Sequence, residues 1–594
     1  MSDYRAPVKD MRFVINELAG LEQIAALPGF EEATPDLVEA VLEEAGALAA
    51  EVIAPTNVLG DEQGAKVTDG QVTVPAEFKE AYSQFIASGW SGISMDPEFG
   101  GQGLPEVVGV AVSEMVQSAN LAWSLCAMLT QGAIHALEAH GSDELKAAYL
   151  EKMITGEWTG TMNLTEPQAG SDLSLVRSLA KPDGDAWKVS GQKIYITWGD
   201  HDMTDNIVHL VLARTPDAPA GVKGLSLFLV PKYTLNADSS PGEINGVHTV
   251  SIEHKLGIHA SPTCVLDFQN STGYLLGEVG HGLRCMFTMM NSARLGVGLQ
   301  GIAVAERAYQ QALTYAVDRK QGTAPGFEGT ATIIEHADVR RMLLTMKSET
   351  EAMRALAYVA MSALDHSHRN PDDDTRAAAH ARVDLLTPIV KGWSTENAQV
   401  LTSLGIQVHG GMGYVEETGA AQHLRDSRIL TIYEGTTGIQ AGDLIGRKTL
   451  RDGGAAMSAL LQDIGATLER VQAGGSELTA IADELSSALD AARDSLQWIL
   501  DNHASDAHIP GAVSYHYLML MGVLCGGWQM ANAALIAQQK LADGTADENF
   551  YAAKLASAKF YAEQALPRAL SHARSITHGC ETMMAFTQDM FEGE

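Results

Sequence analysis

The segments Ala186-Trp-Lys-Val-Ser190, Lys193-Ile-Tyr-Ile-Thr197, Ile207-Val-His-Leu-Val-Leu212 and Leu225-Ser-Leu-Phe-Leu-Val230 decide the fold of this chain. They are short, rich in β-branched and aromatic residues and separated by turn residues, which predicts strands. Similar runs at 248–252 and 263–268 extend the pattern. Because no helical pattern intervenes, we predict a β-barrel or β-sandwich domain of largely antiparallel strands over residues 156–275.

Helical sequence flanks this β-domain on both sides. Apolar residues recur at 3.6-residue spacing from residue 34 to about 155, and again over 294–317, 333–366 and 377–405. After a Gly-rich linker at 451–455, residues 478–503 and 549–575 also predict amphipathic helices. We therefore expect an α+β multidomain protein with the following parts: an N-terminal extension (1–33), an N-terminal helical domain (34–155), the β-domain (156–275), a C-terminal helical bundle (276–450) and an extra helical domain (451–594).

Composition and charge narrow the function classes. The 594 residues include 40 Lys and Arg against 74 Asp and Glu, a formal net charge of −34, which disfavours binding to nucleic acid or anionic membranes. The five cysteines are scattered without a Cys-x-x-Cys pair, and the N-terminus lacks the apolar run of a secretory signal, so we expect a cytoplasmic protein with no metal site. The apolar stretch 518–537 is predicted to be a buried core helix rather than a membrane span.

Two loops carry residues suited to chemistry. Leu164-Thr-Glu-Pro-Gln-Ala-Gly-Ser-Asp172 places hydroxyls and carboxylates just before the predicted strands, although Ser171 or Asp172 capping a helical turn explains the same residues. Tyr433-Glu-Gly-Thr-Thr-Gly-Ile-Gln440 precedes an apolar stretch. Thr436 or Thr437 is suited to cap that helix, which leaves Glu434 outside it, either as a solvated acid or as a general base in a cleft.

Two further segments have polar or flexible features near helix ends. Val408-His-Gly-Gly-Met-Gly-Tyr414 has three glycines that permit close approach of a ligand to the backbone, but such helix ends are common without ligands. Arg319-Lys-Gln321 places two cations at a helix end, suited to a pyrophosphate or to the helix dipole. Neither segment identifies a ligand on its own.

Taken together and in this order, the run from about residue 37 to 447 resembles the acyl-CoA dehydrogenase family of flavoenzymes. The Leu-Thr-Glu-Pro-x-Ala-Gly-Ser-Asp and Tyr-Glu-Gly-Thr motifs carry the resemblance. Lys255-Leu-Gly-Ile-His-Ala-Ser-Pro-Thr263, Asn291-Ser-Ala-Arg294 and the Gly-rich run from Pro97 support it. The resemblance implies an FAD-dependent enzyme with flanking helical domains and a central β-domain.

The resemblance also implies roles for individual residues. Tyr195 stands where the family usually has a Trp that stacks on the flavin, and Glu434 matches the base that removes the α-proton of the thioester as hydride leaves the β-carbon. Ser171, Asn291 and Arg294 match contacts to CoA. The remaining expected FAD contacts are Leu164, Thr165, Thr197, Arg319, Gln321, Gln407, Gly410, Gly411 and Thr436. Because some of these reach a neighbouring subunit's cofactor in the family, a homodimer or a dimer of dimers is implied.

The ends of the chain resemble a longer bacterial subgroup of the family that includes 3-methylmercaptopropionyl-CoA and medium- to long-chain enzymes. The helix around 123–131 lines the acyl pocket in the family, and bulky Trp123 and Met128 favour a short or medium acyl group such as 3-(methylthio)propanoyl-CoA over longer chains. Electron-transfer flavoprotein is the acceptor that the family implies.

Two other functions stay open. A flavin-binding DNA-protective protein needs a basic extra domain, whereas acidic residues outnumber basic ones beyond Arg451. A flavin oxidase such as a nitroalkane oxidase has Asp where Glu434 stands. The acidic extra domain and the glutamate at position 434 therefore both favour a dehydrogenase.

Overall fold

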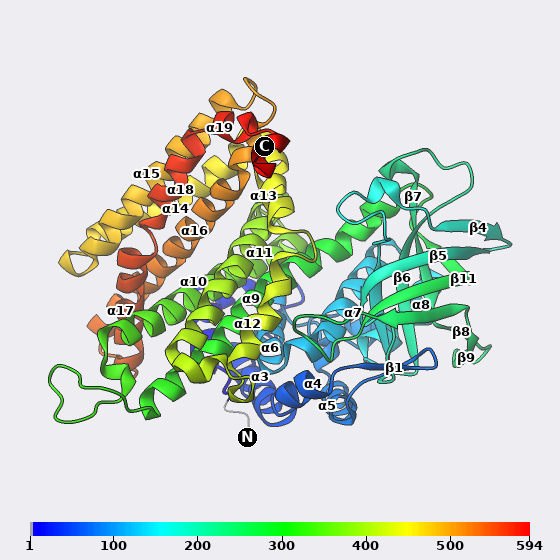
Figure 1. Cartoon of the computed structure of the whole chain (residues 1–594), viewed down its shortest axis with the longest axis horizontal. Helices are drawn as coiled ribbons and strands as arrows, with labels where there is room; N and C mark the ends of the chain where they lie inside the picture. The colour runs from blue at the N-terminus through cyan, green and yellow to red at the C-terminus, as the bar shows by residue number, and fades with distance from the viewer. Residues whose placement is uncertain (1–3, 594) are drawn as a thin grey trace. The chain divides into compact units, whose positions relative to one another are not determined.

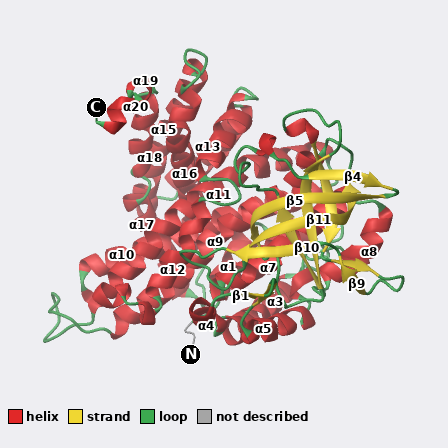
Figure 2. Cartoon of the chain, turned by 45° about the vertical axis from the view of Figure 1, so that its right-hand side comes forward, coloured by secondary structure: helices red, strands yellow, loops and turns green. Residues whose placement is uncertain are grey.

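The computed structural model describes residues 4–593 and divides the chain into two compact units. The first unit contains Ala40–Gly296 and the residues up to Ala6; the second contains Pro7–Glu39 and the chain from Val297 onward. Figure 1 shows the path of the chain and Figure 2 its helices and strands.

A ring of five strands forms the centre of the first unit. β11 pairs with β5, β5 with β4, β4 with β6, β6 with β7, and β7 again with β11, so the ring closes into a barrel. β3 adds to β6 in parallel, and β10 adds to β11. The bounds are β3 (Trp158–Asn163), β4 (Leu179–Asp183), β5 (Ala186–Thr197), β6 (Asn206–Arg214), β7 (Leu225–Pro231), β10 (Val247–Ile252) and β11 (Thr263–Leu276). The predicted β-domain is confirmed, with the first two predicted strands joined into β5.

The barrel has an apolar interior. Alternate residues of its strands point inward, as the two-residue period of a strand requires. The buried cluster consists of Val72, Ala180, Val189, Ile196, Val211, Ala213, Phe228, Val230, Val247, Cys264, Leu266 and Phe268. Two small hairpins complete the strands, β1 (Lys66–Thr68) with β2 (Gln71–Thr73) and β8 (Tyr233–Leu235) with β9 (Pro241–Ile244).

Helices precede the barrel in the first unit. α7 packs against β3, where the backbone N–H of Gly160 donates to Thr130 Oγ1 at 3.0 Å and a Cβ at Gly160 would lie 2.5 Å from Ala133 Cβ. A glycine is therefore needed for this close helix–strand approach. The helices are α3 (Pro35–Leu48), which begins in the second unit, α4 (Thr56–Gln63), α5 (Ala76–Ala87), α6 (Glu106–Ala119), α7 (Leu121–His140) and α8 (Asp143–Ile154).

The second unit is helical throughout its described part. α9, which begins in the first unit, α10 and α11 are long, and α14–α18 form the predicted extra domain beyond the turn at 451–454 (Figure 1). The predicted helix 549–575 is wrong as one element: it is two helices, α17 and α18, because Pro567 cannot continue α17. The bounds are α1 (Val8–Phe13), α2 (Leu21–Ala25), α9 (Gly282–Asp318), α10 (Ala337–Arg369), α11 (Asp373–His409), α12 (Ala420–Ser427), α13 (Thr437–Ile445), α14 (Ala455–Ala473), α15 (Thr479–Asn502), α16 (Ile509–Ala542), α17 (Glu548–Gln564), α18 (Arg568–Thr577), α19 (Glu581–Ala585) and α20 (Gln588–Glu592).

α16 is the core helix of the extra domain. In the described chain it is the one helix long and apolar enough to cross a membrane, and 83% of its most apolar window is buried inside the protein. The prediction of a core helix over 518–537 is confirmed.

Two glycines let α16 approach α11 closely. The fully buried Trp393 of α11 lies against Gly522 and Gly526, where added Cβ atoms would come within 2.2 Å and 2.5 Å of its ring. The extra domain therefore shares a core with the helix bundle before it, because a bulky indole cannot move aside in a close-packed interior.

A buried charge cluster ties the start of the second unit to its end. Arg354 of α10 is 1% exposed and contacts Asp10 of α1 at 2.5 Å and Glu306 of α9 at 2.8 Å. Lys554 of α17 also contacts Asp10, and lies 3.2 Å from Glu351. Burial alone would raise the pKa of Asp10, but Lys554 and Arg354 hold it well below its usual range. The N-terminal extension is thus part of the second unit's core.

We expect Gly522→Ala to lower the free energy of unfolding by about 1–3 kcal/mol, because the new methyl group overlaps Trp393. Gly511→Ala, near the start of the same helix and with open space around it, is the matched control. It should be neutral or stabilising by up to about 1 kcal/mol. Urea unfolding followed by far-UV circular dichroism measures both, and equal effects would contradict the packing argument.

Candidate active site

The loop Leu164–Asp172 follows β3 in the first unit and is held by a buried ion pair. Glu166, 4% exposed, lies 2.8 Å from the ammonium of Lys193, which is fully buried on β5. Lys193 also donates to the carbonyl oxygen of Leu164 at 3.0 Å, and the Ser178 hydroxyl donates to Glu166 at 2.6 Å. These bonds fix the backbone of Leu164 and Thr165 beside β5.

The ionised form of Glu166 is strongly favoured. Burial alone would raise its pKa, but the charge and hydrogen bond of Lys193, with hydrogen bonds from Ser178 and the backbone of Arg177, lower its pKa to about 2. A buried carboxylate with this many donors is an anchor for the loop rather than a proton carrier near neutral pH.

A β-bulge turns Tyr195 out of the barrel. Leu266 pairs with Lys193 and Cys264 with Ile196, so two residues of β5 oppose one residue of β11. Tyr195 has a left-handed φ of 59°, and its side chain is 61% exposed. The neighbouring Ile194 N–H donates instead to the carbonyl of Thr165 at 2.9 Å. The bulge thus presents an aromatic ring next to the 164–165 loop, with the half-buried Thr197 at the end of the same strand.

The C-terminal end of the loop Leu164–Asp172 forms a short helical turn, as predicted from its residue types. Asp172 Oδ1 accepts from the Ser174 N–H at 2.9 Å and caps a short 3-10 turn. Ser171 is exposed beside it.

Glu434 lies in a tight loop before α13 in the second unit. Thr436 caps α13 by accepting from the Ile439 N–H at 3.3 Å, which confirms the predicted cap and leaves Glu434 outside the helix. Glu434 has φ 53° and Gly435 φ 90°, two successive left-handed residues. A non-glycine residue in this conformation is strained, and such strain concentrates at functional sites.

Buried side chains from three helices, to which sequence patterns assign no role, hold this loop. Lys391 of α11 and Gln440 of α13, both fully buried, donate to its carbonyl groups, and the Tyr433 hydroxyl donates to the buried Gln300 of α9. One sequence feature points to Lys391: it is a single charged residue inside an apolar helix segment. A buried ammonium needs nearby acceptors, so such a lysine is expected to bind backbone or side-chain oxygens.

The ends of α9 and α11 lie together in the second unit. Tyr315 of α9 and His409 of α11 have ring centroids 4.5 Å apart. Arg319 and Gln321 follow α9, are exposed and lie 3.5 Å apart. Gln407 is exposed on the last turn of α11, and Gly410 and Gly411 open the turn after it, with nothing within 4 Å of an added Cβ. An exposed cation, amides and open backbone are therefore grouped here.

The remaining predicted residues lie on α9 within the first unit. Asn291 is exposed and Arg294 is 5% exposed. Gly296, one turn beyond Asn291, is close to Met128 of α7, whose sulfur would lie 3.0 Å from an added Cβ.

A narrow pocket of about 20 Å³ in the first unit lies between α5, α6 and α7. Met128 and Gln131 line it, as expected for this helix, but Trp123 does not: its ring is buried against Phe85 and its Nε1 donates to the Phe78 carbonyl. The expectation that Trp123 shortens a pocket here is wrong. The lining residues are Phe85, Trp90, Ile93, Val112, Ser113, Val116, Gln117, Ser124, Ala127, Met128 and Gln131.

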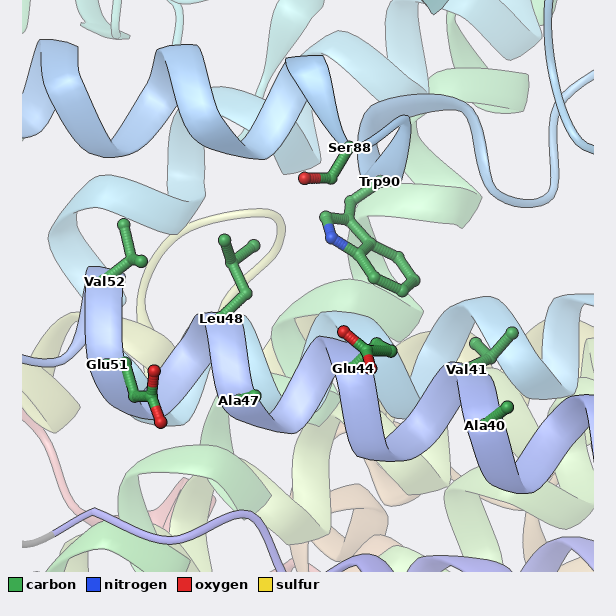
Figure 3. Close-up of a pocket in the computed structure, with 9 residues that line it drawn as sticks. All are labelled: Ala40, Val41, Glu44, Ala47, Leu48, Glu51, Val52, Ser88 and Trp90. Carbon is green, nitrogen blue, oxygen red and sulfur yellow. The ribbon is translucent and has the colours of Figure 1, made fainter.

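A larger, open hollow of about 470 Å³ lies between α3 and the end of α5 (Figure 3). Trp90 reaches toward α3 from above, and Leu48 points up from α3. Glu44 and Glu51 give the hollow an acidic border. None of the predicted site residues lines it.

Comparison with known proteins identifies the chain. Four family models match it in succession: acyl-CoA dehydrogenase N-terminal domain (36–157), middle domain (161–271), C-terminal domain (280–449), and acetyl-CoA dehydrogenase C-terminal like (460–587). The 3-methylmercaptopropionyl-CoA dehydrogenase of Ruegeria pomeroyi is 49% identical over 98% of this chain and 99% of its own length. The chain belongs to the acyl-CoA dehydrogenase family.

Other members are more distant. A butyryl-CoA dehydrogenase of Syntrophomonas wolfei is 36% identical over 95% of both chains. Among solved structures, Caenorhabditis elegans ACDH-11 in complex with C11-CoA has a TM-score of 0.77 at 20% identity, covering 95% of this chain and 92% of that one. An acyl-CoA dehydrogenase complexed with FAD from Bacillus anthracis has a TM-score of 0.74 at 21% identity, covering 93% and 90%. These structures confirm the fold, including the extra C-terminal helices.

Acyl-CoA dehydrogenases are FAD-dependent, and the residues present suit this cofactor. In the first unit, the exposed Tyr195 ring offers an aromatic face for a flavin. In the second, the Arg319 guanidinium can donate to a pyrophosphate, and the open glycines at 410 and 411 admit a ligand close to the backbone. When bound, FAD supplies the hydride acceptor of the reaction.

The depressed pKa of Glu166 predicts an acid-dependent loss of stability. Its carboxylate stabilises the fold above the ordinary value of 4.5, and this contribution is lost as the pH falls from 4.5 toward the folded pKa of about 2. Over this range, we expect the free energy of unfolding of the wild-type protein to fall by roughly 3 kcal/mol more than that of Glu166→Gln. Urea unfolding between pH 7 and 2.5 measures the difference. Asp172 is an exposed acid of the same loop, so Asp172→Asn should differ much less from wild type in this pH dependence. Parallel curves of unfolding free energy against pH for wild type and Glu166→Gln would contradict the prediction.

Proposed function

We propose that this acyl-CoA dehydrogenase oxidises a short or medium acyl-CoA thioester to its trans-2-enoyl-CoA, with 3-(methylthio)propanoyl-CoA as the favoured substrate. The single observation that supports this choice of substrate is the 49% identity, over nearly the full length of both chains, to a 3-methylmercaptopropionyl-CoA dehydrogenase. The narrow pocket lined by Met128, about 20 Å³, has no room for a long acyl chain and so supports a short acyl group. A medium- or long-chain fatty acyl-CoA is the alternative, because a broad-specificity linear acyl-CoA dehydrogenase of Mycobacterium tuberculosis is also 34% identical over 96% of the chain.

We propose that Glu434 is the catalytic base. Its carboxylate removes a proton from the α-carbon of the thioester while a hydride leaves the β-carbon. The negative charge that develops on the thioester oxygen needs hydrogen-bond donors, and the backbone N–H of Glu434 is the donor that the family implies. The loop geometry supports this role, because the cap on Thr436 and the left-handed φ of Glu434 keep the acid outside α13 and in a fixed backbone conformation.

The proposed cofactor and substrate contacts follow the family. Ser171, Asn291 and Arg294 would bind CoA. The FAD contacts would be Leu164, Thr165, Tyr195 and Thr197 of the first unit, and Arg319, Gln321, Gln407, Gly410, Gly411 and Thr436 of the second. The anchoring of Leu164 by Lys193 and the exposure of Tyr195 support the flavin assignments.

We also propose a cytoplasmic homodimer, or dimer of dimers, that passes its electrons to electron-transfer flavoprotein. Met412, Tyr414 and Val415 are 49%, 86% and 42% exposed on the segment that follows the proposed FAD contacts Gly410 and Gly411. A second copy covering these apolar side chains explains their exposure. The five free cysteines, all buried, suit a reducing compartment.

We expect anaerobic 3-(methylthio)propanoyl-CoA or butanoyl-CoA to bleach the flavin absorbance of purified wild-type protein. Glu434→Gln should retain FAD but slow the bleaching by roughly 10²–10⁴-fold, because the general base is lost. Glu417→Gln, an exposed acid nearby in the sequence, should behave as wild type. Stopped-flow absorbance measures the rates, and bleaching of Glu434→Gln at the wild-type rate would contradict the assignment of the base.

We expect Met128→Ala to lengthen the preferred acyl chain, because removing the thioether side chain enlarges the pocket. The ratio of kcat/KM for octanoyl-CoA to that for butanoyl-CoA should rise by roughly tenfold or more. Met583→Ala, an exposed methionine of α19, is the control and should leave the ratio unchanged. An unchanged ratio in Met128→Ala would show that another pocket receives the acyl group.

A further inference from the structure

Lys391 lies fully buried in α11 with its ammonium directed at the loop that carries Glu434. The Nζ atom donates to the carbonyl oxygen of Leu430 at 2.8 Å and to that of Gly435 at 2.6 Å. Burying an ammonium is unfavourable unless its N–H groups find acceptors. The two carbonyl oxygens therefore satisfy the lysine, and the lysine in turn fixes both of them.

These two carbonyls stand on either side of Glu434. Leu430 is a buried residue of the preceding 3-10 turn, Arg428–Thr431, and Gly435 directly follows Glu434. The carbonyl of Glu434 itself accepts from the Gln440 amide at 3.2 Å. Because Glu434 and Gly435 both have left-handed backbones, their carbonyls do not join a helix ladder, and side chains supply the donors instead.

The helix that carries Lys391 is itself immobilised. Two residues further on, Trp393 lies between Gly522 and Gly526 of α16, and a Cβ on Gly392 would lie 2.4 Å from Leu518. The Thr395 hydroxyl donates to the Lys391 carbonyl at 2.7 Å. Lys391 thus connects the loop of Glu434 to the close-packed contact between α11 and the extra domain.

We propose that Lys391 is a positioning residue for Glu434. Through the carbonyls of Leu430 and Gly435 it holds the strained loop in the one backbone conformation that aims the carboxylate at the α-carbon. This inference rests on the proposed role of Glu434 as the base. It assigns the extra domain a part in catalysis, since α16 fixes the segment of α11 from which Lys391 reaches the loop.

The test measures proton removal separately from hydride transfer. In 3-thiabutanoyl-CoA a sulfur replaces the β-carbon, so the α-proton can leave and a deuteron from D₂O can return, but no hydride can follow. Nuclear magnetic resonance measures this exchange with FAD-loaded protein. Binding of the same probe, FAD content and the unfolding midpoint are measured in parallel.

We expect Lys391→Met to slow the exchange by roughly 10–100-fold, because the rate of proton removal falls steeply when the base is slightly displaced. The affinity for the probe should change by less than about threefold. Lys554→Met, which breaks the distant buried charge cluster, is the control for lost stability and should exchange at the wild-type rate. If Lys391→Met does not fold, Lys391→Gln keeps donors on a shorter side chain and should also slow the exchange.

The outcomes separate this inference from the proposed function. Exchange at the wild-type rate in a folded Lys391→Met or Lys391→Gln protein, with Glu434→Gln inactive, would overturn the positioning role. Exchange at the wild-type rate in Glu434→Gln would instead remove Glu434 as the base. An equal loss of exchange in Lys554→Met would show that Lys391 contributes stability only.

Discussion

Irregular backbone that carries chemistry must find hydrogen-bond donors inside the protein, and each unit of this chain meets that requirement with one fully buried lysine. Lys193 donates to Leu164 in the loop after β3, and Lys391 donates to Leu430 and Gly435 around Glu434. Carbonyls left unpaired in such positions would each cost about 1–3 kcal/mol. These ammonium groups therefore help the loops to depart from regular structure without unpaired carbonyls.

Both lysines donate to backbone carbonyls, and Lys193 also contacts a carboxylate. Lys193 has the ionised Glu166 beside it, so that loop contains a paired charge. Lys391 donates to two backbone carbonyl oxygens around the proposed base. The first arrangement suits a loop that only has to stay in place, and the second suits one that presents an acid to a substrate.

The sequence predicted the architecture well because strand alternation and helix periodicity follow directly from burial. It also predicted the cap on α13, since a threonine directly before an apolar helical stretch is a favoured N-cap residue. It failed where tertiary contacts decide: Trp123 turned away from the pocket toward Phe85, and Pro567 divided a helix whose periodicity looked continuous. Lys193 and Lys391 were missed because a lone lysine in an apolar segment does not reveal which carbonyls it will meet.

The cluster of Asp10, Arg354 and Lys554 joins residues from the two ends of the chain. Its consequence concerns synthesis: α1 leaves the ribosome early, but its partner α17 follows more than 500 residues later. The first unit can fold while translation continues, whereas the core of the second must wait until almost the whole polypeptide has emerged. Until then the apolar face of α11 around Trp393 lacks its cover, so the partly synthesised chain exposes the surface that later packs against α16.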